Sequence, residues 1–304
     1  MVTDAAPVQT QQQREPLAGF VYAISAYGLW GFFPLYLKAV DHIPAFEVVA
    51  HRVVWSVPVA GLLIILLRRT SDLRAAFRSP RTLALAGLTA SLISVNWGIY
   101  VWAVANEQTM EAALGYYINP LVNVVLGALF LGERFTRLQA LAIALAAIAV
   151  CILTIAAGGL PWVALVLPVT FGFYGFFRKT LPIGPSQGFM LEVLLLSLPA
   201  LGVIGWLAAQ GTGHFITTGA GDFGLLLLAG PTTAAPLILY AFGAKALRFT
   251  TIGILQYIAP TMMFLMAVFV FGEPFSTLRL VAFMFIWAAL VLYTISLFRP
   301  ARAA

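Results

Sequence analysis

The chain has 304 residues, of which 62% are hydrophobic and only 9% are charged, and its formal net charge is +6 at pH 7. Soluble domains carry roughly a quarter of charged residues, so a water-soluble enzyme is excluded and the bilayer is expected to surround most of the surface. The basic residues form short clusters between apolar runs and no continuous basic face, which excludes nucleic acid as a partner.

Ten apolar runs follow one another along the chain, each long enough at about 1.5 Å per residue to cross a hydrocarbon layer of roughly 30 Å. Short linkers rich in Pro and Gly separate them, and none is long enough for a separate domain. We therefore predict an all-α integral membrane protein with ten spans, at 17–38, 44–67, 82–104, 110–131, 136–157, 162–180, 186–208, 222–245, 250–271 and 277–298. A disordered cytoplasmic tail at 1–16 precedes them, and a cytoplasmic tail at 299–304 follows.

The distribution of Lys and Arg predicts the orientation of these spans. With the N-terminus in the cytoplasm, 14 of the 17 basic residues fall on the inner side, Lys38 and Arg279 fall outside, and Arg52 lies within a span. Cytoplasmic loops carry an excess of Lys and Arg. The predicted location is therefore the bacterial inner membrane with both termini in the cytoplasm, and this requires an even number of crossings.

The sequence contains an internal repeat. At an offset of 140, GYYINP at 115–120 aligns with LQYIAP at 255–260, and at an offset near 144, GLWGFF at 28–33 aligns with GFYGFF at 172–177. Each unit contains five spans, so the second copy must enter the membrane from the opposite side. We predict two inverted-topology repeats, 17–157 and 162–298, that enclose a substrate cavity near the midplane and alternate between inward-open and outward-open states.

Polar and aromatic residues at helical spacing in spans three and four, with their counterparts in the second repeat, indicate the wall of this cavity. The predicted cavity residues are Trp30, Asn96, Trp97, Tyr100, Tyr116, Asn119, Asn123, Tyr174, Thr233, Tyr240 and Gln256. For each Asn and Gln the alternative is a hydrogen bond between packed spans. Pro120 and Pro260 lie at equivalent depths of spans four and nine and are predicted hinges, because proline removes a backbone hydrogen bond. The ordinary abundance of proline in membrane helices is the alternative.

Ionisable residues inside a membrane are costly and therefore are functional hypotheses by default. Glu47, His51 and Glu192 are candidates for coupling transport to a proton gradient. The alternative is that Glu47 and Arg52 lie near the outer interface and only pair or snorkel.

Two further acids, Glu133 and Glu273, follow a Gly at helix ends and are expected to cap or anchor the next helix. The chain has no Walker A sequence, no HExxH motif, no hydrolase nucleophile elbow and no cluster of Cys and His. We therefore predict no enzymatic activity, no cofactor and no metal.

The sequence resembles the EamA-type branch of the drug/metabolite transporter superfamily and its RarD-like group. The resemblance covers almost the whole chain and is carried by AYGLWGFFPLYLK (26–38), HRVVWS (51–56), NWGIYVWAVAN (96–106), ALGYYINPLVNVVLG (113–127), GERF (132–135) and ILQYIAPTMMFL (254–265). It implies a central cavity formed mainly by spans three, four, eight and nine. Bacterial amino acid exporters of the YddG type share this architecture.

We expect an exporter of amino acids, including aromatic and neutral ones, or of similar small metabolites. The alternatives are a multidrug or toxic-compound exporter and, from another class, a non-transporting membrane assembly or signalling protein. The expected partners are a small-molecule substrate and the lipid bilayer, while the direction, the energy coupling and the oligomeric state stay open.

Overall fold

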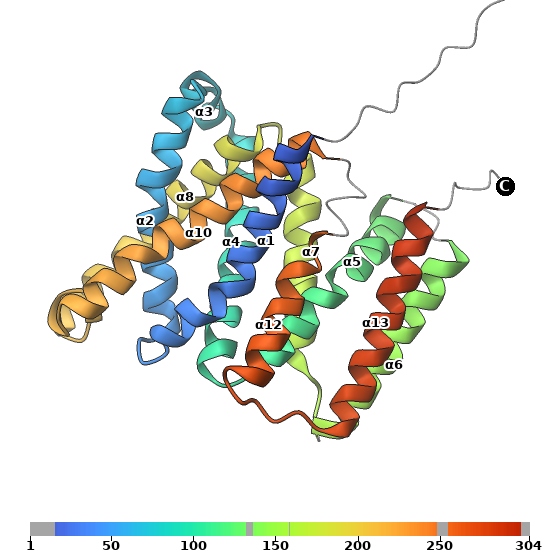
Figure 1. The fold of residues 1–304 in the computed structure, drawn as a ribbon. Coiled ribbons are helices and arrows are strands. Elements are labelled where there is room, and N and C mark those ends of the chain that lie inside the picture. The colour runs from blue at the N-terminus through green and yellow to red at the C-terminus, as the bar shows by residue number, and fades with distance from the viewer. Residues whose placement is uncertain (1–15, 132–135, 158, 248–254, 299–304) are drawn as a thin grey trace, which may run out of the picture.

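The computed structural model describes residues 16–131, 136–157, 159–247 and 255–298, and these residues form helices and no strands (Figure 1). The long helices are α1 (Leu17–Ala39), α2 (Ala45–Leu66), α4 (Pro80–Ala105), α5 (Thr109–Leu131), α6 (Arg137–Ala157), α7 (Trp162–Thr180), α8 (Pro185–Gln210), α10 (Ala220–Ala246), α12 (Ile258–Phe269) and α13 (Thr277–Phe298). Eight of them are long and apolar enough to cross a membrane, while the apolar helices Trp162–Arg178 and Ile258–Phe269 are shorter. Predicted spans six and nine correspond to the two shorter helices.

Nine of the ten spans begin and end within two residues of their predicted bounds, because hydrophobicity and breaker residues are local properties. Within the ninth prediction, 250–271, the helix is interrupted: α12 covers Ile258–Phe269, and Gln256 and Tyr257 form a turn between it and Leu255, which is helical. Pro260 gives the physical reason, since a proline cannot donate to the carbonyl four residues earlier, which is that of Gln256. Residues 250–254 lie outside the described part of the chain.

Two predicted linkers also contain short helices, α3 (Thr70–Phe77) and α9 (His214–Thr217). After α3, the hydroxyl of Ser79 accepts a hydrogen bond from the backbone N–H of Thr82 and caps α4, whose first residue is Pro80. Both features are strong start signals for a helix. Each short helix therefore lies between two spans without extending either.

The packing of the long helices follows the predicted inverted repeat. α1 packs on α10, and the equivalent helix of the second half, α7, packs on α4; likewise α5 packs on α7, and α12 packs on α1. The pairs α2 with α8, α5 with α12 and α6 with α13 join equivalent helices directly. Figure 1 shows α6 and α13 side by side and running in opposite directions, and the start of α1 and the end of α13 at the same end of the bundle. This is the relation that inverted repeats of five spans require.

Glycines allow the closest helix crossings. A side chain at Gly230 of α10 would overlap the backbone carbonyl of Trp55 on α2, and one at Gly115 of α5 would crowd the carbonyl of Ala164 on α7 at 3.2 Å. Small residues at helix interfaces permit such backbone approach in membranes. Large apolar side chains lie on the outside instead, where Leu198 is 81% exposed and Leu129 is 72% exposed. Such an apolar surface is suited to contact with lipid tails.

Candidate functional site

A row of aromatic rings crosses the centre of the bundle from α1 to α7. Phe33 of α1 stacks on Tyr100 of α4, with ring centroids 6.1 Å apart, and Tyr100 meets Tyr116 of α5 edge-on at 5.6 Å. Tyr116 then contacts Phe171 of α7 at 6.4 Å, which contacts Tyr174 on the same helix at 5.8 Å. The structure therefore brings three of the predicted cavity residues, on three different helices, into one continuous row.

A second aromatic group joins α1 and α10. Trp30 lies between Tyr27 and Tyr240, with centroid distances of 5.6 and 5.8 Å, and Tyr27 and Tyr240 are themselves 6.0 Å apart. Trp30 and Tyr240 are half-buried and pack against the same hydrophobic core as Tyr100. These two predicted residues thus lie together, at the crossing of one helix from each half.

The predicted amide residues differ in their surroundings. Asn96 is buried and donates to the carbonyl of Leu167 at 2.9 Å and to the hydroxyl of Thr170 at 2.8 Å, so it makes the interhelical bonds that were its alternative interpretation. Asn119 is buried on α5 and its Oδ1 has no hydrogen-bond partner. Asn123 is exposed and Gln256 is half-buried in the turn before α12, so the structure does not join these two to the aromatic row.

The two predicted hinge prolines occupy different structural positions. Pro120 lies inside α5, twelfth from its start at Thr109, whereas Pro260 is the third residue of α12. A proline in the first turn of a helix removes no hydrogen bond, while an interior proline does. The two halves therefore break the backbone at this depth in different ways, and a hinge role for either proline stays a prediction.

Arg52 of α2 is a buried charged residue that contacts two of the predicted cavity residues, Thr233 and Trp97. It is only 4% exposed, and its Nε donates to the hydroxyl of Thr233 on α10 at 3.0 Å. Its guanidinium carbon lies 4.7 Å from the ring centroid of Phe33 and 4.7 Å from that of Trp97. Of the alternative that Glu47 and Arg52 pair or snorkel near the outer interface, the pairing of Glu47 is observed with His214, whereas Arg52 is buried.

The contacts of Arg52 do not balance its charge. No carboxylate in the described part of the chain pairs with it, and its Nη1 is buried without a hydrogen-bond partner. Each cation–π contact contributes up to about 2 kcal/mol when desolvated, whereas burial of an ion costs several kcal/mol. A sequence signal for this residue existed: it is a charge eight residues into an apolar span with no acid three or four residues away.

Glu192 of α8 forms the second buried charged group. Its carboxylate accepts hydrogen bonds from Thr89 of α4 at 2.7 Å and from Tyr174 of α7 at 3.3 Å, and it pairs with Arg178 of α7 at 3.1 Å. Glu192 is 2% exposed. Its charge is therefore neutralised within the protein, in contrast to that of Arg52.

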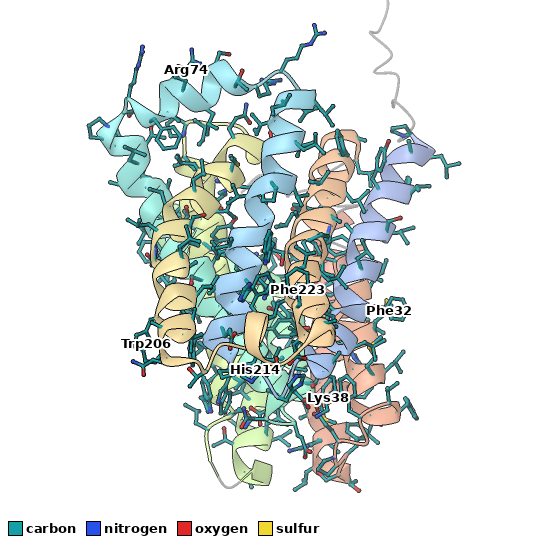
Figure 2. All side chains as sticks on the ribbon, turned by 90° about the vertical axis from the view of Figure 1, so that its left-hand side faces the viewer. Phe32, Lys38, Arg74, Trp206, His214 and Phe223 are labelled. Carbon is teal, nitrogen blue, oxygen red and sulfur yellow. The ribbon has the colours of Figure 1, made fainter. Side chains whose placement is uncertain are left out.

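The other two candidates for proton coupling lie far from Glu192, near the start of α2. Glu47 accepts from the backbone N–H of His214 at 2.7 Å and bonds its Nδ1 at 2.8 Å, at the start of α9. His51 stacks on Phe215 with centroids 4.7 Å apart and accepts from Nε1 of Trp55. Figure 2 shows His214 at one end of the bundle and Arg74 at the other. The three candidates thus form two separate groups.

Glu273 lies in the segment before α13 and binds the start of a helix from the other half. Its two carboxylate oxygens accept from the backbone N–H groups of Thr109 at 2.8 Å and Met110 at 2.9 Å. The expected capping role is therefore observed, although the capped helix is α5 and not the next helix along the chain. Its repeat counterpart Glu133 lies outside the described residues.

An open groove of about 530 Å³ lies at the end of the bundle that carries α3. It is lined by residues of α3, α4 and α8, of the linkers that follow α2, α3 and α7, and by Phe242 of α10, and no predicted cavity residue contributes to it. The aromatic rows and Arg52 lie elsewhere, packed in the interior. The residues described here hold no group of three or more His, Cys, Asp or Glu side chains that could bind a metal ion.

Comparison with known proteins shows which protein family this chain is similar to. The model of the "EamA-like transporter family" matches residues 17–155. "Protein RarD" of Streptomyces exfoliatus is 43% identical, over 95% of this chain and 92% of that protein. "Chloramphenicol-sensitive protein RarD" of Pseudomonas aeruginosa is 34% identical, over 90% of this chain and 92% of that protein.

One protein of known crystal structure is similar in fold. It superposes with a TM-score of 0.58 at 20% sequence identity, and the match covers 91% of this chain and 96% of the other. At this identity the likeness concerns the architecture alone.

Proposed function

This chain belongs to the EamA-like transporter family, together with the RarD proteins, and is a multi-pass membrane transporter; from that premise we propose that it exports amino acids or similar small metabolites across the bacterial inner membrane. Transport proceeds by alternating access between the two inverted halves. The start of α1 and the end of α13 lie at the end of the bundle that carries α3 (Figure 1), and this Arg-rich end faces the cytoplasm in the proposed orientation.

The observation that carries this proposal is the aromatic and polar seam between the halves. Tyr100 of the first half donates to the sulfur of Met263 at 3.6 Å, Tyr117 donates to Thr261 at 2.7 Å, and Trp30 packs on Tyr240. These side chains hold α4, α5 and α1 against α12 and α10 in the closed arrangement. When the halves part, the same rings line the space between them and contact a small solute.

The aromatic walls also favour a second candidate, a multidrug exporter. Rings contact apolar and cationic solutes alike and discriminate mainly by size. The Pseudomonas aeruginosa relative is called chloramphenicol-sensitive, which links that protein to a drug. Counterflow of drugs and of amino acids in the same liposomes separates the two candidates.

The test is flux of radiolabelled neutral and aromatic amino acids from proteoliposomes that contain purified protein. Tyr100→Ala and Tyr240→Ala are expected to slow release at least tenfold, because each removes a ring from the seam. Tyr22→Ala is the matched control, since Tyr22 is 39% exposed on α1 and packs on Phe242. Unchanged release in both cavity variants contradicts the site, and absence of amino acid flux in the unmodified protein contradicts the substrate class.

A pH gradient across the same liposomes tests energy coupling. If Glu192, Glu47 or His51 carries protons, amino acid release accelerates with the gradient and the matching Gln variant loses this response. Equal release with and without the gradient assigns these residues structural roles.

A further inference from the structure

We propose that Arg52 binds the carboxylate of the transported solute, so that the transporter selects solutes that carry a carboxylate group; this inference rests on the proposed transport function. Arg52 carries a buried hydrogen-bond donor that lacks a partner. The Nη1 of Arg52 is buried and makes no hydrogen bond, while Nε is occupied by Thr233. Arginine stays charged in proteins, so this donor must be matched by an acceptor from outside the chain.

The surroundings of Arg52 restrict how a ligand can reach it. Phe33 and Trp97 lie over the guanidinium, each with its ring centroid 4.7 Å from the guanidinium carbon. Two aromatic rings and the hydroxyl of Thr233 therefore already contact the group, and a ligand can bind only the N–H groups that they leave unoccupied. Two parallel N–H···O bonds at the edge of a guanidinium are the geometry in which arginine recognises carboxylates.

The position of Arg52 matches that of a substrate group in an inverted-repeat transporter. It lies on α2 of the first half and bonds α10 of the second, and the ring of Phe33 that contacts its guanidinium also stacks on Tyr36 and Tyr100. Substrate sites in such transporters lie at the interface of the repeats. Arg52 thus places a fixed positive charge among the residues of the proposed cavity.

A second buried atom without a hydrogen-bond partner is an acceptor and not a donor. Oδ1 of Asn119 accepts no hydrogen bond, and Asn119 follows Tyr116 by three residues on α5. An acceptor of this kind suits an ammonium group.

This arrangement predicts strong discrimination between carboxylates and their neutral analogues. A bound carboxylate neutralises Arg52 when the halves close, whereas an amide leaves the charge buried without a counter-ion. Sites built around a buried polar group reject ligands that leave it unpaired far more strongly than apolar pockets reject a missing methylene.

Binding to purified protein in detergent tests the inference independently of flux. The probes are phenylalanine, phenylalaninamide and 3-phenylpropionate, and the readout is the ligand concentration that gives a half-maximal rise of the melting temperature. We expect phenylalanine and 3-phenylpropionate to bind at least tenfold more tightly than phenylalaninamide. Arg52→Gln removes that preference, Arg52→Lys retains part of it, and the matched control Arg279→Gln keeps it, since Arg279 bonds the carbonyl of Pro274.

A second variant keeps the test valid if Arg52→Gln does not fold. Thr233→Asp places a carboxylate beside Arg52, which should raise the melting temperature and abolish binding of both carboxylate probes. Equal binding of phenylalanine and its amide, or full preference in Arg52→Gln, overturns the inference. If the carboxylates bind as expected but no amino acid is released from liposomes, the carboxylate site stands and the proposed export of amino acids fails.

Discussion

Arg52 and Glu192 occupy equivalent positions in the two halves, but only Glu192 forms an ion pair within the described part of the chain. Each is the eighth residue of its helix, counted from Ala45 in α2 and from Pro185 in α8. Each bonds a threonine on the third span of the other half, Thr233 of α10 for Arg52 and Thr89 of α4 for Glu192. The inverted repeat thus places a buried cation in one half and a buried anion at the matching position of the other.

The difference between them lies in one neighbouring position. Glu192 pairs with Arg178 of α7, and at the offset of 144 that aligns the repeats the counterpart of Arg178 is Pro34 of α1. Proline carries no charge, so Arg52 has no internal counter-ion where Glu192 has one. The proposed carboxylate ligand would supply the missing counter-ion in the first half, whereas the second half has its own in Arg178.

The largest expected difference between the two halves is in how removal of an arginine changes the stability of the protein. Arg178→Gln leaves Glu192 buried without its cation, and breaking a buried pair by removing one partner costs about 3 to 5 kcal/mol. Arg52→Gln removes a charge that has no partner, so it is expected to leave the melting temperature unchanged or to raise it. Thermal unfolding in detergent, followed by tryptophan fluorescence, measures both.

The double variant Arg178→Gln with Glu192→Gln is the control for this prediction. It removes both charges and should recover most of the lost stability. If Arg52→Gln lowers the melting temperature as much as Arg178→Gln does, Arg52 is balanced within the protein and the comparison fails.

The sequence predicted the spans well because their determinants are local. Apolar length and breaker residues gave nine pairs of bounds within two residues, and the repeat predicted two inverted halves, with which the helix packing agrees. The ninth span differed because Pro260 interrupts the hydrogen bonding that a hydropathy pattern does not register.

The site was harder to predict, because it depends on how helices are rotated against each other. Arg52 and Thr233 are 181 residues apart, and sequence spacing within one helix cannot show that they meet. The Thr on α10 was predicted as a cavity residue, but its charged partner was assigned to an interface because it lies near the start of its span. The aromatic residues were easier to find, since both repeats carry them at matching positions.

The next largest effect concerns the crossing of α2 and α10. A methyl group at Gly230 would overlap the backbone carbonyl of Trp55, one turn from the contact between Arg52 and Thr233. Overpacking costs about 1 to 3 kcal/mol, which corresponds to roughly a 5- to 150-fold loss of the closed state. Gly230→Ala is therefore expected to slow transport about tenfold and to expose this region, and thiol labelling of Thr233→Cys in a Cys151→Ala background measures the exposure.

Gly224→Ala is the matched control on the same helix, because no atom lies within 4 Å of the added methyl group. The equivalent test in the second half is Gly188→Ala, whose methyl group would overlap the guanidinium of Arg178. That obstacle is the flexible end of a side chain and not backbone, so the loss should be smaller. Equal labelling in Gly230→Ala and Gly224→Ala would show that this crossing does not close over Arg52.

The smallest effects are expected from the two threonines, and these variants separate the role of Arg52 from that of Glu192 most directly. Thr89→Val removes the 2.7 Å hydrogen bond to Glu192 and should cost about 1 kcal/mol of stability without changing the preference for carboxylates. Thr233→Val removes the acceptor that orients Arg52, so it should weaken binding of 3-phenylpropionate a few-fold while the melting temperature stays within a degree or two. The same substitution, made beside each of the two equivalent charged residues, then affects stability in one half and ligand binding in the other. A loss of binding in Thr89→Val equal to that in Thr233→Val would mean that both charged groups serve the substrate.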